Sequence, residues 1–139
     1  MHLKVFYNEI NSFITRKLQQ PIRVQYGGNG AISLNYTYKK KVAIIGEIKK
    51  DILISLSVHS VSSDRIVLRA DSGAVVGFFL PTVIKSVASS NNLDFMSMSG
   101  DKIKIMLDRI PEVSSVLEKV SLSDVKIESD GVDVQVTLK

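Results

Sequence analysis

Apolar and polar residues alternate along most of this 139-residue chain, as they do in strands with one face buried and the other in water. Turn-forming residues separate the alternating segments at intervals of roughly ten residues, which is typical of an antiparallel meander. We therefore expect strands at 22–26, 32–38, 42–48, 52–58, 65–70, 102–107, 125–127 and 132–138.

The expected turns differ in their chemistry. Gly27-Gly28-Asn29-Gly30 and Ser129-Asp130-Gly131 predict hairpin turns, because glycine and asparagine readily take positive φ. Lys49-Lys50-Asp51 is expected to turn the chain between 42–48 and 52–58, and Lys39-Lys40-Lys41 precedes the first of these strands. Lysines at turns and sheet edges commonly maintain solubility and block edge-to-edge pairing.

Helical spacing appears near the N-terminus and again before the last two strands. From Val5 to Leu18, apolar residues recur every three or four positions, which predicts an amphipathic helix that Pro21 ends. Its apolar face consists of Phe6, Ile10, Phe13, Ile14 and Leu18. Pro111 suits the first turn of a second, short helix.

The longest apolar stretch, Ser72 to Asn92, predicts a third helix. One face carries Val76, Phe79, Leu80, Val83 and Val87, and the apolar residues beside them widen it over most of the circumference. Such a helix must be surrounded, either by the protein's own sheet or by something that it binds. Pro81 leaves two possibilities, a kinked helix or one that begins at Pro81 after a separate turn at 74–80.

Together these patterns predict a single α+β domain over residues 1–139. We expect a curved antiparallel β-meander sheet packed around the central apolar helix, with an N-terminal amphipathic helix. The chain is long enough to bury a core without disulfides or metal, and its 45% hydrophobic and 23% charged residues are ordinary for a folded protein.

Charge is unevenly distributed. The net charge is +4, but residues 1–50 carry nine Lys/Arg and only two acids, whereas the rest of the chain is net acidic. This asymmetry favours an anionic partner near the N-terminal half: lipid head groups, nucleic acid or an acidic protein. Stacking on Tyr26, Tyr36 and Tyr38 beside Lys39 to Lys41 would suit single-stranded nucleic acid, although we consider this partner the least favoured.

No catalytic or cofactor signature is present. Cysteine is absent, which excludes thiol nucleophiles and cysteine-ligated metals. His2 and His59 belong to no catalytic motif, and most aspartates fall at expected turns or caps. We expect a protein that is not an enzyme and needs no cofactor. Because no signal peptide or membrane-spanning segment is recognised, the expected location is the cytoplasm unless a signal or anchor has been removed.

The order of elements from Asp51 onward resembles that of the tubular lipid-binding superfamily and related small bacterial lipid-binding domains. The segments that carry it are ISLSVHSVSSDRIVLRAD, FFLPTVIKSVASS, DKIKIMLDRIPEV and DVKIESDGVDVQVTLK. The resemblance implies a strongly curved sheet around a long helix, with an acyl chain held between them. It depends on element order and hydropathy, so it transfers no functional residue. The absence of an export signal departs from what bacterial members usually show, and the small size departs from the larger, two-module members.

The resulting hypothesis is a non-enzymatic module that binds a lipid, a fatty acid or another apolar or anionic amphiphile between helix and sheet. The ligand chain would contact Val76, Phe79, Leu80, Val83, Val87, Ile54, Leu56 and Val58. The anionic head group, or an anionic membrane surface, would be attracted by Lys39, Lys40, Lys41, Lys49 and Lys50. The alternative is a structural or protein-interaction domain with a fully packed core and no small-molecule ligand.

Overall fold

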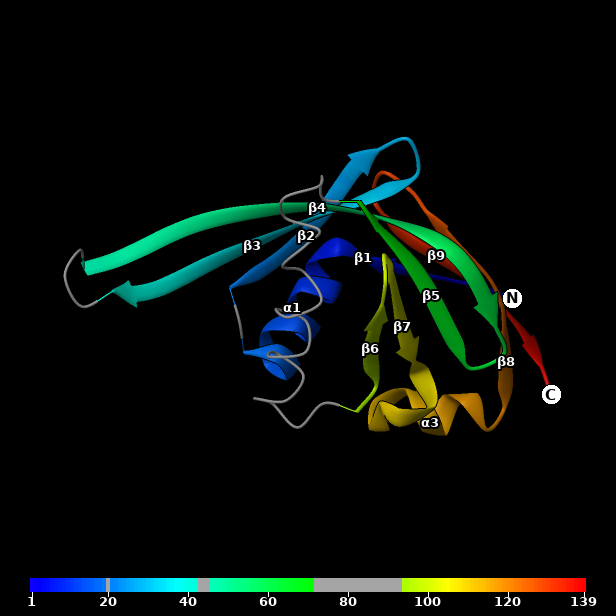
Figure 1. Cartoon of the computed structure of the whole chain (residues 1–139). Coiled ribbons are helices and arrows are strands. Elements are labelled where there is room, and N and C mark those ends of the chain that lie inside the picture. Colours follow the sequence, from blue (N-terminus) through cyan, green and yellow to red (C-terminus); the bar gives the residue numbers. More distant parts are fainter. Residues whose placement is uncertain (20, 43–45, 72–93) are drawn as a thin grey trace.

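The computed structural model describes residues 1–19, 21–42, 46–71 and 94–139; for 38–42 and 47–50 it describes the backbone alone (Figure 1). The larger of two antiparallel sheets has six strands in the order β2-β3-β4-β5-β7-β6. These strands are β2 (Ile22–Gly28), β3 (Ala31–Val42), β4 (Gly46–Ser62), β5 (Arg65–Asp71), β6 (Met96–Ser99) and β7 (Lys102–Met106).

The smaller sheet has the order β1-β9-β8 and joins the two ends of the chain. Its strands are β1 (His2–Phe6), β8 (Val120–Ile127) and β9 (Gly131–Leu138). Helix α1 (Tyr7–Leu18) follows β1, and a short 3-10 turn, η1 (Leu107–Arg109), leads into helix α3 (Pro111–Leu117). The predicted turn before β3 is confirmed, with positive φ angles of 89°, 53° and 71° at Gly28, Asn29 and Gly30.

The predicted α+β architecture was wrong. The described part of the chain is mostly β strand in two sheets, and it contains no central apolar helix packed within a curved sheet. The helix expected between Ser72 and Asn92 lies outside the described residues. Strand content was underestimated because two lysine-rich segments and the N-terminal residues were not assigned to strands.

The turn expected at Lys49-Lys50-Asp51 was also wrong. These residues lie within β4, and Lys39-Lys40-Lys41 lie within β3. The two strands pair without a register shift from Ile32 opposite Leu56 to Val42 opposite Gly46. Lysine is disfavoured in strands only weakly, and a continuous ladder that satisfies the backbone groups overrides this preference.

The N-terminal helix begins two residues later than predicted, because residues 2–6 pair with β9. The Glu9 carboxylate accepts a hydrogen bond of 3.0 Å from the Phe6 backbone N–H and so satisfies a donor at the start of the helix. The Lys4 ammonium lies 2.9 Å from Asp130 and 3.0 Å from Glu128. Together, the strand pairing and these contacts hold the start of the chain against the β8–β9 hairpin.

Asn11 of α1 covers the outer edge of β2. Its side-chain amide donates to the Val24 carbonyl at 3.0 Å, and its carbonyl oxygen accepts from the Val24 N–H at 2.7 Å. The side chain therefore makes the two hydrogen bonds that a neighbouring strand would make. This contact fixes α1 against the sheet and removes a pairing site from an edge strand.

We expect Asn11→Ala to lower the free energy of unfolding by about 1–3 kcal/mol, because two part-buried backbone groups lose their partners. Urea unfolding followed by circular dichroism measures this effect. Asn8→Ala, at an exposed position on the same helix, is the matched control and should change stability much less. Equal effects of the two substitutions would contradict the proposed role of Asn11.

The Lys4–Asp130 contact predicts a specific pH dependence. Its hydrogen bond from Lys4 lowers the pKa of the Asp130 carboxyl below its usual 3.8. Because the folded-state pKa is the lower one, the contact stabilises the fold above that usual value, and this contribution is lost as pH falls through the lowered pKa. The effect is small because both groups are reached by solvent.

Asp130→Asn should therefore lower the free energy of unfolding slightly at neutral pH, and the difference from wild type should vanish well below pH 3.8. Urea titrations at the two pH values provide the comparison. Glu118→Gln, at an exposed position before β8, controls for the loss of one negative charge. A difference for Asp130→Asn that persists unchanged in acid would mean that the ion pair is not its source.

Candidate functional site

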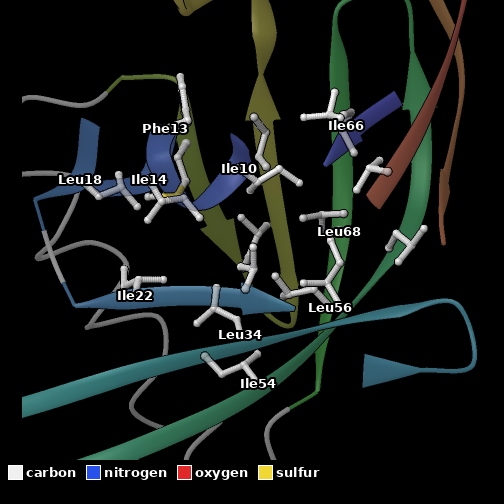
Figure 2. A pocket seen from close by; sticks show the side chains of 18 of the residues that line it. Ile10, Phe13, Ile14, Leu18, Ile22, Leu34, Ile54, Leu56, Ile66 and Leu68 are labelled. Atoms are coloured by element: carbon white, nitrogen blue, oxygen red, sulfur yellow. The ribbon is translucent and has the colours of Figure 1, made fainter. Parts of the chain in front are cut away.

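A cavity of about 390 Å³ lies between α1 and the inner face of the six-stranded sheet. Figure 2 shows side chains of α1 and of the sheet strands arranged around one space. Helix α1 contributes Ile10, Phe13, Ile14 and Leu18. Strands of the smaller sheet also reach the wall through Val125, Ile127 and Val132. The cavity is therefore bounded by both sheets and one helix.

The alternation of the sequence explains the sheet wall. Three directly paired positions of β3 and β4 line the cavity: Ile32 with Leu56, Leu34 with Ile54, and Tyr36 with Ile52. The positions between them belong to the other face, and there Leu53 is 61% exposed whereas its neighbour Ile54 is 4% exposed. A one-residue shift of register would reverse these faces, so the ladder itself creates the apolar wall.

The wall is chemically uniform. Among the described residues that line the cavity, all except Tyr36 are apolar and none is charged. At the α1 side, the rings of Phe13 and Phe95 lie with their centroids 6.4 Å apart, and the Arg16 guanidinium lies 5.7 Å from the Phe13 ring centroid. Such a surface can bind hydrocarbon, but it offers no partner for an ion inside the cavity.

The predicted ligand-chain residues divide into two groups. Ile54, Leu56 and Val58 line the cavity. The other five, Val76, Phe79, Leu80, Val83 and Val87, lie outside the described residues. The prediction omitted the contribution of α1 and of Leu34 and Tyr36, although the helical spacing of α1 and the alternation in β3 already marked these residues as one apolar face each.

The predicted head-group lysines occur together on the outer part of the β3–β4 ladder. Lys39 is directly opposite Lys49, Lys50 is opposite Tyr38, and Lys40 and Lys41 follow along β3. Lys50 and Tyr38 form the second pair beyond Tyr36 and Ile52, two residues that line the cavity. The ladder thus connects an apolar wall to a lysine-rich backbone segment.

The described residues give little support to a metal site or to a stacking surface for nucleic acid. They contain no group of three His, Asp or Glu side chains placed to hold a metal ion. Tyr36 lines the cavity, and the Tyr26 oxygen accepts a hydrogen bond of 3.2 Å from the Gly30 N–H at the far end of the β2–β3 hairpin. These two tyrosines do not form a joint stacking surface. No helix in the described ranges combines the length and apolarity needed to span a membrane.

Comparison with known proteins does not place the chain in a family. No family model, no curated protein and no solved structure matches it. The functional argument therefore depends on the cavity and on the lysine-bearing strands.

The two faces of β4 predict opposite responses to a charge. Ile54→Lys should lower the free energy of unfolding by about 3–5 kcal/mol, because the ammonium would be buried without a partner. Leu53→Lys, one residue away on the exposed face, should change it by no more than about 0.5 kcal/mol. Urea unfolding of both variants measures the difference. Similar values would contradict the assignment of Ile54 to the inner face.

Proposed function

We propose that this protein binds a lipid, fatty acid or related amphiphile, with the hydrocarbon chain in the cavity between α1 and the six-stranded sheet. The observation that carries the proposal is the cavity of about 390 Å³, whose described lining residues are apolar except for Tyr36. This volume falls in the range of ligand sites, roughly 300–1,000 Å³. The removal of alkyl surface from water supplies the binding free energy.

The polar end of the ligand is proposed to lie toward Tyr36 and the lysine-bearing part of the ladder. By the two-residue period of a strand, Lys40 and Lys50 belong to the same face of the ladder as Tyr36 and Ile52. Lys50 is about 7 Å along the strand from Ile52, given the rise per residue. Two cations at this end favour an anionic head group over a neutral one.

The competing hypothesis is a structural or protein-interaction domain whose interior is filled by its own apolar residues. It differs from lipid binding in one measurable respect. A close-packed interior takes up no ligand, whereas a preformed apolar cavity does so without a change of fold. Measurement of ligand uptake therefore separates the two hypotheses directly.

The test combines native mass spectrometry of the purified protein with titration of a fluorescent fatty acid. We expect a bound lipid-sized mass or saturable uptake by the emptied protein. Leu34→Trp, which places a larger side chain in the cavity wall, should weaken uptake at least about tenfold. Leu53→Trp adds the same bulk on the exposed face of the adjacent strand and should leave uptake unchanged.

Three results would overturn the proposal. The first is a bare mass together with no uptake of the fatty acid or of its neutral alcohol. The second is equal weakening by the two tryptophan variants, because that would place the ligand elsewhere. The third is uptake that Leu34→Trp leaves unaltered in a variant whose circular dichroism spectrum is native.

A further inference from the structure

The outer part of the β3–β4 ladder extends beyond the rest of its sheet. We call the segments 37–42 and 46–51 the lysine ribbon. Pairing of β2 with β3 ends at Ile22 opposite Tyr36, and pairing of β5 with β4 begins only at Ser55. In Figure 1 the outer parts of β3 and β4, cyan to green, project away from the other strands. Among the described strands, the ribbon is therefore a two-stranded element with no third strand paired to either outer edge.

The ribbon holds most of the net charge of the protein. It contains five lysines and only two acids, Glu47 and Asp51, so it carries +3 of the total of +4. Asp51 is at the base of the ribbon, where it accepts a hydrogen bond of 2.9 Å from the Thr37 hydroxyl. Farther out, Lys39 is opposite Lys49, Lys40 is opposite Ile48, and Lys41 is opposite Glu47.

The pair of Lys39 and Lys49 destabilises the ribbon. Like charges directly opposite each other destabilise an antiparallel pair, and a two-stranded ribbon without further strands is only marginally stable. An anionic surface would offset this repulsion. It would therefore bind lysines that are paired on the ribbon more strongly than the same lysines on separate strands. The placement of the lysines thus favours a polyanionic partner.

A single ligand head group at the cavity does not account for all five lysines. Lys41 is five residues beyond Tyr36, which corresponds to about 17 Å along the strand. This distance exceeds the reach of a lysine side chain with its four-carbon stem. A partner with many negative charges spread over a surface would reach the outer lysines as well.

We propose that the lysine ribbon docks the protein on an anionic lipid bilayer, from which the cavity receives its ligand. The choice of a bilayer rests on the proposed lipid-binding function, because the same two strands continue from the cavity wall into the ribbon. A single-stranded nucleic acid is less favoured. It would need neighbouring aromatic side chains for stacking, and Tyr36 faces the cavity instead.

The test is sedimentation of the full chain with phosphatidylcholine vesicles, with and without phosphatidylserine. We expect binding only to the anionic vesicles. The triple variant Lys39→Gln, Lys41→Gln and Lys49→Gln removes the net charge of the ribbon but keeps Lys40 and Lys50. Each lysine near such a membrane contributes about fivefold in affinity, so the partition coefficient should fall on the order of a hundredfold.

A matched control removes the same charge elsewhere. Lys104, Lys119 and Lys126 are exposed on β7, before β8 and on β8, and their replacement by glutamine should lower binding only a few-fold. Equal losses in the two triple variants would overturn the proposal, since binding would then follow total charge. Failure of the wild-type protein to bind anionic vesicles would overturn it as well. So would stronger binding to single-stranded DNA than to these vesicles.

Lysines on an outer strand also block edge-to-edge pairing, so their replacement by glutamine favours self-association. The pair Lys39→Glu and Lys49→Glu avoids this effect. It keeps two charged edges and the repulsion between strands but inverts the sign. Loss of vesicle binding in this monomeric variant supports docking, and retained binding overturns it. Uptake of a fatty alcohol in vesicle-free solution tests the cavity separately. If the wild-type protein takes up no alcohol, the proposed function is wrong. Docking is tested only by the vesicle-binding measurements.

Discussion

The structure depends on the unbroken antiparallel pairing of β3 with β4. The ladder runs for eleven residue pairs, from Ile32 opposite Leu56 to Val42 opposite Gly46. One end supports the rest of the sheet, because β2 pairs with β3 and β5 pairs with β4 there. The same register places three pairs, apolar except for Tyr36, on one face and so creates the cavity wall, while the lysines lie at its far end. A slip of one residue would move the apolar wall to the solvent side and would remove the cavity.

Elements from the two ends of the chain cover the inner face of the six-stranded sheet. Strand β1 pairs with β9, the chain then enters α1, and Asn11 attaches the helix to the edge of β2. The smaller sheet approaches the larger one where the Leu122 N–H donates to the Ser63 carbonyl at 3.0 Å. Contacts between residues so distant in sequence are costly in chain entropy, and the burial of apolar residues from both sheets offsets that cost.

Local patterns in the sequence predicted the strand faces well. The exposed Leu53 and the buried Ile54 and Leu56 follow the two-residue period, and the glycine-rich turn before β3 occurs where positive φ was expected. The failures have a common physical cause, since they involve residues whose strand partners a local pattern does not identify. Val5 and Phe6 were assigned to the N-terminal helix, but they belong to a strand because β9 supplies hydrogen bonds. Lysine-rich segments resemble turns until an opposite strand is known.

Sequence patterns predicted the cavity less well than the strands around it. The same alternation builds a filled core or an open site, because both need an apolar face of the same width. Ile54, Leu56 and Val58 could be assigned to that face, but the position of α1 above it depends on the Asn11 contact and on β1, neither of which has a local signature. Sequence patterns thus identified part of the wall and not the space that it encloses.

Salt should act on the lysine ribbon in two opposite ways. Screening weakens the repulsion between Lys39 and Lys49 and so stabilises the paired strands, but it also weakens attraction to an anionic surface. The repulsion involves a few neighbouring charges, whereas docking sums over a whole charged surface. Docking should therefore be the more salt-sensitive of the two. At high salt the ribbon should become more stable and yet bind anionic membranes less. This combination is expected of an element whose internal repulsion is relieved by its partner. It is not expected of lysines that serve only to keep an edge soluble.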